Sequence, residues 1–432
     1  MRTWLASLAI AASGCLAFCA LGAASGLDNI QGGNTQARHV WRAPGDHVEV
    51  PFQWHDGHLI IPVRVNGSAQ VRLAFDTGAS ATVLFETART RSLAMKADGQ
   101  IRVGSAEGRR GTPVNIVTGV SIDVGAIGIE RLTILHVPLA TSPIFGSADE
   151  AYFDGAIGYD LLRRFVTEID YVRQTIRFSR KGGPARASPW RTLPIDVSAR
   201  VPYVAVKLRD ENSTAGVKLL VDTGAPSFAY MNPDLIDGMD VPVLGYLTRG
   251  NGFNGPFERR SGRLRGFDIG GIKFDDLLVN FDRTDFKDLG RGVGLIGNGV
   301  LANFDLVLDY SARTLSIRPN KRFSARSAAD RSGIDLEPHT LGGVVQSIAG
   351  GSGASKIGLK RGDIVTHLDS RKIESGGFDQ AKKLLSSARA FVEICWRSGI
   401  KEQCARLPLA DRLAASPRVR REPVRASFMP CI

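Results

Sequence analysis

Short segments that alternate apolar and polar residues recur along most of the chain. Residues 61–67 and 203–208 both show this alternation, which is typical of strands with one buried face. Each segment leads through a polar turn into an apolar run, at residues 71–75 and 217–221, that we expect to be a buried strand. Glycine-rich turns separate these short segments. The pattern predicts a mainly β protein.

These segments belong to a long internal duplication, in which matched pieces follow one another in the same order. Beyond the strands already named, residues 122–127 match 267–272, residues 154–159 match 292–298, residues 161–165 match 300–304, and residues 169–171 match 308–310. The spacing between partners shortens along the chain, so the two halves differ mainly in their loops. The duplication predicts two related lobes, residues 50–182 and residues 191–320, around a pseudo-twofold axis.

Both buried strands end in the same short motif. Residues 76–80 read Asp-Thr-Gly-Ala-Ser, and residues 222–227 read Asp-Thr-Gly-Ala-Pro-Ser. A single copy would also fit a strand followed by a tight turn. An isolated carboxylate is costly to bury, but two that meet can share one proton, since like charges about 3 Å apart cannot both ionise easily. Asp76 and Asp222 are therefore candidates for an acid–base pair.

The two motifs, each followed further along by an apolar pair and a glycine, resemble the retropepsin-like branch of the pepsin-type aspartic proteases. The resemblance covers residues 50–320 and implies a two-lobed, pseudo-symmetric fold that hydrolyses peptide bonds without a metal or organic cofactor. It implies that Asp76 and Asp222 form the catalytic dyad. One carboxylate would act as base on a water molecule, and the other carboxyl group, protonated, would act as acid.

The resemblance also implies roles for the residues around the dyad. Thr77 and Thr223 would brace the two active-site loops against each other, and ordinary strand-end packing is the alternative. Gly78 and Gly224 would let the backbone turn and approach the water. The residues expected to pack beneath the aspartate loops are Ile157, Gly158, Ile296 and Gly297.

Glycine-rich segments at residues 104–111 and 250–257 lie between each aspartate and its apolar-glycine partner. Hairpins there would close over a bound peptide, and mobile surface loops are the alternative. Pepsin-like enzymes carry a tyrosine in their flap, but no tyrosine lies between Asp76 and Val120. This difference favours a flap of the retropepsin kind.

The two motifs depart from the pepsin pattern at three positions. Ala79 and Ala225 stand where pepsins often have a hydroxyl residue. Without a hydroxyl that donates a hydrogen bond to the charged carboxylate, the pKa of the aspartate should be lowered less. We therefore expect a pH optimum for activity that is less acidic than that of pepsin. Pro226 has Ser80 as its counterpart, which breaks the symmetry between the loops.

The first 24 residues have the pattern of a secretory signal. Arg2 precedes an apolar stretch from Trp4 to Ala24 that ends in small residues. The stretch is long enough that an uncleaved membrane anchor is the alternative. We therefore expect an exported protein, periplasmic or in the cell envelope, with residues 25–49 as a linker.

The formal net charge is +12, and much of the excess lies in a basic tail at residues 411–432. The aromatic residues are not interleaved with the basic ones, which argues against a nucleic-acid partner. An acidic envelope surface, or solubility alone, accounts for the charge. The histidines have no cysteine or acidic partners at the spacing of metal ligands, and the sequence His55-Asp56-Gly57-His58 predicts a turn.

A third domain, α+β, is expected at residues 335–410 after a basic linker at residues 321–334. The sequence Gly-Leu-x-x-Gly-Asp at residues 358–363, between two apolar strands, resembles the PDZ domains of bacterial envelope proteases. The resemblance implies that a ligand peptide is added as a strand and that backbone amides hold its carboxylate. The implied carboxylate-binding residues are Leu341, Gly342, Gly343 and Val344; a generic strand and turn is the alternative.

Cys395 and Cys404 lie in two segments that predict a hairpin with a Gly399-Ile400 turn. That register places them directly opposite, close enough for a disulfide, which export would favour. Two reduced, packed cysteines are the alternative. Cys431 has no assigned role.

Together these features predict an exported, monomeric aspartic endopeptidase that acts on peptide or protein substrates and carries a peptide-binding PDZ domain. The first alternative is a catalytically silent scaffold that captures peptides. The second is a homodimer in which each motif pairs with a copy from another subunit.

Overall fold

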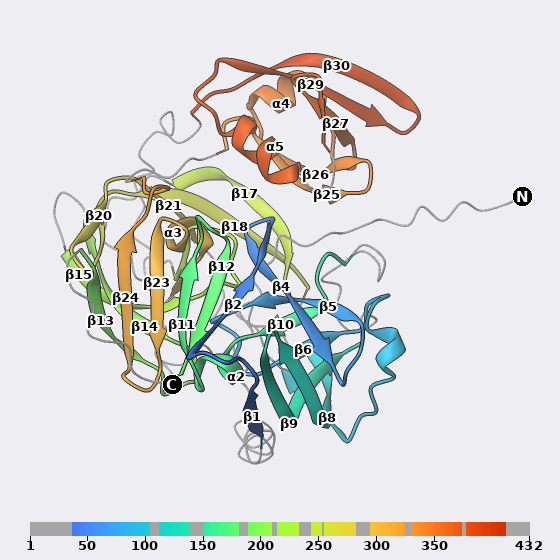
Figure 1. The fold of residues 1–432 in the computed structure, drawn as a ribbon. Helices are drawn as coiled ribbons and strands as arrows, with labels where there is room; N and C mark the ends of the chain where they lie inside the picture. Colours follow the sequence, from blue (N-terminus) through green and yellow to red (C-terminus); the bar gives the residue numbers. More distant parts are fainter. Residues whose placement is uncertain are drawn as a thin grey trace, which may run out of the picture.

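The structure is a computed structural model. It describes residues 37–103, 112–138, 151–180, 189–209, 214–232, 243–252, 255–281, 294–324, 330–373 and 377–411. Within these ranges the protein is mainly β, as its alternating pattern predicts. Two β lobes lie side by side, and a smaller C-terminal domain lies above them in the view of Figure 1.

The first lobe is built on a nine-stranded sheet in the order β1-β9-β6-β10-β5-β4-β8-β7, with β3 paired to β4. Its elements are β1 (Arg38–Trp41), β2 (His47–Pro51), β3 (Gln53–His55), β4 (His58–Val65), β5 (Gln70–Phe75), β6 (Val83–Phe85), the 3-10 helix η1 (Arg91–Leu93), β7 (Gly99–Val103), β8 (Thr112–Val124), β9 (Ile127–Val137), β10 (Gly155–Ile157), α2 (Tyr159–Leu162), β11 (Val166–Asp170) and β12 (Thr175–Ser179). Buried residues alternate with less buried ones in the second half of β4 and the first half of β5, whereas residues 59–61 and 73–75 are buried on both faces of the sheet.

The second lobe repeats this plan. Its elements are β13 (Arg191–Asp196), β14 (Tyr203–Arg209), β15 (Thr214–Val221), β16 (Ala229–Met231), β17 (Val243–Gly252), β18 (Gly255–Leu264), β19 (Phe267–Ile269), β20 (Ile272–Phe274), β21 (Leu277–Phe281), β22 (Gly294–Ile296), α3 (Asn298–Leu301), β23 (Phe304–Asp309) and β24 (Thr314–Pro319). The correspondence is closest at the motifs: β10 runs parallel to β5, and β22 runs parallel to β15.

The two lobes share a sheet at their junction. β11 of the first lobe pairs antiparallel with β23 of the second, with Ile169 opposite Leu306. β12 and β2 extend this sheet on one side, and β24 and β13 extend it on the other. The paired residues, 167–169 and 306–308, thus end where the matched segments at residues 169–171 and 308–310 begin.

The linker expected at residues 25–49 is partly wrong. β1 and the first residues of β2 fall within it, and both strands belong to the folded lobes. Val48 and Val50 are buried between polar neighbours, which is the alternation of a strand with one face on the core.

The C-terminal domain has a sheet of its own in the order β25-β26-β27-β29-β30, with β28 paired to β27. Its elements are β25 (Ile334–His339), β26 (Gly342–Ile348), α4 (Gly353–Lys356), β27 (Ile364–Leu368), β28 (Arg371–Lys372), α5 (Phe378–Leu385), β29 (Phe391–Ser398) and β30 (Lys401–Pro408). Its apolar core is separate from the core that the two lobes share. No helix in the described ranges is long and apolar enough to cross a membrane.

Candidate active site

The two aspartates lie at equivalent places in the two lobes. Asp76 follows β5 directly, and Asp222 follows β15. The backbone N–H of Asp76 donates to the carbonyl of Ile157 over 3.0 Å, and that of Asp222 donates to Ile296 over 3.0 Å. Both aspartates are fully buried. The apolar-glycine segment of each half therefore holds the aspartate of the same half.

The glycine of each apolar-glycine segment is required by close backbone contact. A Cβ at Gly158 would lie 1.8 Å from the carbonyl oxygen of Asp76, and a Cβ at Gly297 would lie 2.4 Å from that of Ser227. Any larger residue would push the aspartate loop away from the segment beneath it. This packing explains why the sequence repeats the pair.

Thr77 and Thr223 connect the loops across the junction between the lobes. The N–H of Thr77 donates to Oγ1 of Thr223, and the N–H of Thr223 donates to Oγ1 of Thr77, each over 3.0 Å. The Thr77 hydroxyl also donates to the carbonyl of Val221, and the Thr223 hydroxyl donates to that of Phe75. These four reciprocal hydrogen bonds hold the two aspartate loops in one fixed relation.

Each carboxyl group contacts the glycine of its own loop and the glycine of the opposite loop. Within each loop, Gly78 N–H donates to Oδ1 of Asp76 over 2.7 Å, and Gly224 N–H donates to Oδ1 of Asp222 over 2.8 Å. A Cβ at Gly224 would lie 2.4 Å from Cγ of Asp76, and a Cβ at Gly78 would lie 2.8 Å from Oδ1 of Asp222. Neither glycine has a positive φ, so space for the facing carboxyl requires glycine here.

The two acidic groups influence one another electrostatically. Burial raises the pKa of Asp76 well above its ordinary value, and the charge of Asp222 and a hydrogen bond shared with it raise that pKa further. Hydrogen bonds from the backbone of Gly78 and Ala79 oppose the rise but are weaker. A pair in this state retains one proton at pH values where an isolated aspartate has lost it.

Asn298 is a buried polar residue that the sequence analysis did not identify. Its side-chain amide donates to the carbonyl of Thr223 over 2.6 Å and to that of Gly57 over 2.7 Å. Its carbonyl oxygen accepts a hydrogen bond from the Tyr171 hydroxyl over 2.8 Å. Asn298 thus ties the second aspartate loop to the first lobe. The duplication could have drawn attention to this position, because Asn298 corresponds to Tyr159 in the first half, directly after the glycine beneath the aspartate loop.

The exchange of Ser80 for Pro226 has a structural counterpart. A Cβ at Gly57 would lie 2.5 Å from Cβ of Pro226, so the turn between β3 and β4 packs directly on the second loop. Asp56 and Gly57 both have positive φ in this turn, which the sequence predicts. The side chains of Ala79 and Ala225 are buried and carry no hydroxyl.

The glycine-rich segments can be placed only in part. Residues 104–111 lie outside the described ranges, between β7 and β8. In the second lobe, β17 and β18 form a hairpin in which Gly250 is opposite Phe257 and Gly252 is opposite Gly255. Residues 253 and 254 at its tip also lie outside the described ranges.

The structure places the four residues expected to hold a peptide carboxylate in the turn before β26 and in the first residues of that strand. Leu341 is exposed in the turn before β26, and Gly343 and Val344 are paired with both β25 and β27. A Cβ at Gly342 would lie 2.1 Å from the carbonyl of Val365, so this glycine allows close strand packing. No peptide strand can be added to β26 at these residues, because both of its edges are already occupied.

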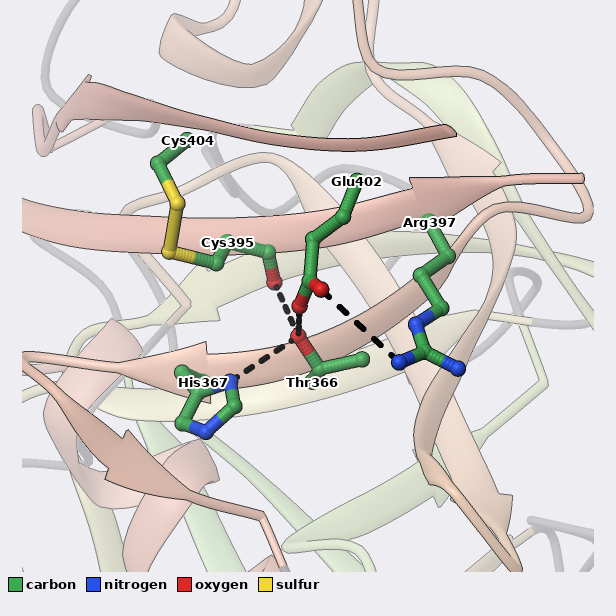
Figure 2. The surroundings of a disulfide bond; sticks show 6 residues. All are labelled: Thr366, His367, Cys395, Arg397, Glu402 and Cys404. Carbon is green, nitrogen blue, oxygen red and sulfur yellow. Dashed lines mark hydrogen bonds and ion pairs between the residues drawn. A yellow bond between two sulfur atoms is a disulfide. The ribbon is translucent and has the colours of Figure 1, made fainter. Parts of the chain in front are cut away.

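The structure contains the disulfide between Cys395 and Cys404. The cysteines lie opposite each other on β29 and β30, with their Cα atoms 4.0 Å apart. Figure 2 shows their polar surroundings: the Thr366 hydroxyl contacts the carbonyl of Cys395, and Glu402 forms an ion pair with Arg397. Among the described residues, no cluster of His, Cys, Asp and Glu is suited to a metal ion. Cys431 lies outside the described ranges.

Comparison with known proteins shows a similarity to aspartyl proteases in the first lobe. An aspartyl protease family matches residues 61–161, which include Asp76 and the segment beneath it. Among solved structures, the aspartic proteinase from Irpex lacteus is similar at 13% sequence identity and a TM-score of 0.42, over 65% of this chain and 99% of that chain. No curated protein matches the chain. The first lobe, from Ile61 to Leu161, is thus similar to an aspartyl protease family.

Proposed function

We propose that the protein is an aspartic endopeptidase whose two catalytic carboxyl groups come from one chain. The arrangement of Asp76 and Asp222 carries this proposal: each is buried and lies against the glycine of the other loop. Because both belong to the same chain, no second subunit is needed to complete the pair. A monomer is therefore favoured over the homodimer.

The chemistry follows from one proton shared by two carboxyl groups. The ionised member removes a proton from a water molecule as the water attacks the peptide carbonyl. The protonated member donates to the carbonyl oxygen or to the leaving nitrogen. Because burial and the mutual influence of the two carboxyl groups raise the pKa at this pair, the pair as a whole retains one proton in the free enzyme. The threonine cross-brace keeps the two groups at a fixed separation.

Substitution of each aspartate by asparagine tests the dyad. We expect Asp76→Asn and Asp222→Asn each to reduce cleavage of an unfolded protein substrate by ~10³-fold or more. Asp275→Asn, at an exposed aspartate of the second lobe, is the matched control and should leave cleavage unchanged. Full activity in either dyad variant would remove that residue from the dyad. A wild-type chain that binds the substrate but never cuts it would favour the scaffold alternative, against which two intact buried acids argue.

We further propose that the enzyme is exported and works in the periplasm or cell envelope. The apolar N-terminal stretch and the disulfide support this location. Fractionation of cells, followed by N-terminal sequencing, tests it. Recovery of the protein in the cytoplasmic fraction with a reduced Cys395 would contradict the proposal. Retention of residues 1–24 in the mature protein would favour the membrane-anchor alternative.

The C-terminal domain is proposed to bind peptides as PDZ domains do. β25 supports this reading, because it is an edge strand of the domain's sheet and pairs on its outer side with no strand of the described residues. Fluorescence anisotropy with labelled peptides that end in a free or an amidated carboxyl group tests the proposal. Equal affinity for the two peptide forms would contradict recognition of a terminal carboxylate.

A further inference from the structure

The turn between β3 and β4 of the first lobe is held from the inside by aromatic side chains. His58 is fully buried, and its Nδ1 lies 3.1 Å from the hydroxyl of Tyr152. The rings of His55 and Tyr152 are 4.5 Å apart. At the tip of this turn, Asp56 is only 3% exposed, although a hairpin tip is ordinarily a solvated position.

The C-terminal domain buries this tip. Nζ of Lys382, on α5, lies 2.6 Å from Oδ1 of Asp56. One helical turn earlier, the carboxylate of Asp379 accepts a hydrogen bond from the backbone N–H of Asp56. Asp335, on the edge strand β25, is close enough to both Asp56 and Lys382 to interact electrostatically with them. The tip of the first lobe thus contacts the face formed by α5 and β25, which we call the α5–β25 face.

The charges on the two sides of this contact are complementary. Burial lowers the pKa of Lys382, but the carboxylates of Asp56, Asp335 and Asp379 raise it by more, so its ammonium group remains charged. Lys382 keeps 40% of its side-chain surface exposed, whereas the Asp56 side chain is 2% exposed. The cation therefore comes from the C-terminal domain, and the buried anion comes from the first lobe.

The same turn touches the second catalytic loop on its other side. The carbonyl of Gly57 accepts from the Asn298 amide, and Gly57 packs against Pro226. Further along, β17 of the second-lobe hairpin lies against β26 of the C-terminal domain. In the docked arrangement the C-terminal domain therefore contacts both the turn that supports the Asp222 loop and the second-lobe hairpin, which contains the segment expected to form a flap.

We propose that the C-terminal domain is an autoinhibitory cap, docked through insertion of the Asp56 turn into its α5–β25 face. While docked, the cap holds the β17–β18 hairpin and restricts access of a protein substrate to the dyad. A peptide that pairs with β25 and contacts α5 competes with the Asp56 turn, so peptide binding releases the cap. The inhibitory effect rests on the proposed peptidase function, whereas the docking does not.

Hydrogen–deuterium exchange in the full chain tests the docking directly. Lys382→Met and Asp56→Asn should each accelerate exchange of the amides of residues 53–60 by about fivefold or more, because each removes one partner of the ion pair. Asn tolerates the positive φ of position 56, so the second variant preserves the turn. Lys356→Met, at an exposed lysine on α4 of the same domain, is the control and should change nothing.

The double variant Asp56→Asn with Lys382→Met guards against misfolding, because it removes both members of the Asp56–Lys382 ion pair together. It should show the same fast exchange of residues 53–60 with an unchanged melting temperature of the C-terminal domain. Unchanged exchange in all three variants would overturn the docking. The same variants should raise kcat/KM for an unfolded protein substrate about fivefold, since exposure of the hairpin tracks the open population.

Fast exchange with unchanged or lower kcat/KM would overturn the inhibitory role. A chain that shows no peptidase activity in any form would instead sink the proposed function, while the exchange data still decide whether the domain docks.

Discussion

Gly224 illustrates how little room the site leaves at the scale of one residue. A Cβ added there would lie 2.4 Å from Cγ of Asp76, so Gly224→Ala must displace the carboxyl group. A displacement of about 1 Å in a catalytic group costs ~10²-fold in rate, and we expect at least that loss in kcat. The measurement is steady-state cleavage of a peptide, with a thermal melt to verify the fold.

Gly216→Ala is the matched control for this substitution. Gly216 lies in β15 six residues before Asp222, has no positive φ, and has nothing within 4 Å of an added Cβ. It should retain full activity. Full activity in Gly224→Ala as well would contradict the close contact between the two loops.

The pKa of Asp76 sets the pH dependence of both activity and stability. Burial and the neighbouring Asp222 raise this pKa well above the ordinary value. The single proton of the dyad is therefore retained to higher pH, and we expect kcat/KM to fall on the alkaline side only well above the usual range of carboxyl groups. A pH–rate profile with a peak near pH 2 would contradict this expectation.

Stability should depend on the same proton. Because the folded state raises the pKa of Asp76, the folded state binds this proton more tightly than the unfolded state does. The contribution is fully present below the unfolded pKa and is lost as the pH rises through the folded value. In Asp76→Asn this decline in the melting temperature at high pH should be absent.

At the scale of elements, the β29–β30 hairpin provides a test that is confined to the C-terminal domain. The disulfide closes a loop with a sequence separation of 9. Its loss in Cys395→Ala with Cys404→Ala should lower the free energy of unfolding of this domain by about 2–3 kcal/mol. Calorimetry of the variant should match that of the reduced wild type. A variant as stable as the oxidised wild type would show that the bridge does not stabilise the domain.

The elements that could be predicted from the sequence are those that local pattern or internal repetition reveals. Alternation gives β4 and β14, and the duplication places Asp76 and Asp222 after matched strands. β25 was not predicted, because its short sequence crosses the expected boundary between the linker and the third domain. Its position as the edge strand depends on pairing partners, which no local pattern specifies.

Contacts between distant segments were the least predictable part of the candidate site. Lys382 and Asp56 are separated by 326 residues and belong to different domains. Asn298 looks like an ordinary polar residue after a glycine, and its role appears only where three backbone segments converge on it. Such contacts follow from the packing of whole lobes, and a single sequence carries no local signal for them.

At the scale of the whole molecule, docking of the C-terminal domain should depend on pH. The contact gathers Asp56, Asp335 and Asp379 around the ammonium group of Lys382, Glu337 lies near Tyr152, and His55 and His58 flank the turn. Burial raises the pKa of Asp335 to about 6, and the nearby Asp330 and Asp56 raise it while Lys382 lowers it. Docking places the carboxylate of Asp56 near Asp335, and this neighbour favours the protonated form of Asp335, so docking should weaken as the pH rises through about 6.

An opposite limit applies at low pH. Burial lowers the pKa of His58 to about 4, so protonation of its ring below that value would disturb the turn that carries Asp56. Docking should consequently be strongest between these two values. Exchange of residues 53–60, corrected for the intrinsic rate at each pH, should be slower at pH 5 than at pH 7.5. Asp335→Asn should remove this difference, because an amide in place of the carboxyl group cannot ionise. Equal protection at both pH values in the wild type would show that the buried carboxyl groups do not control the cap.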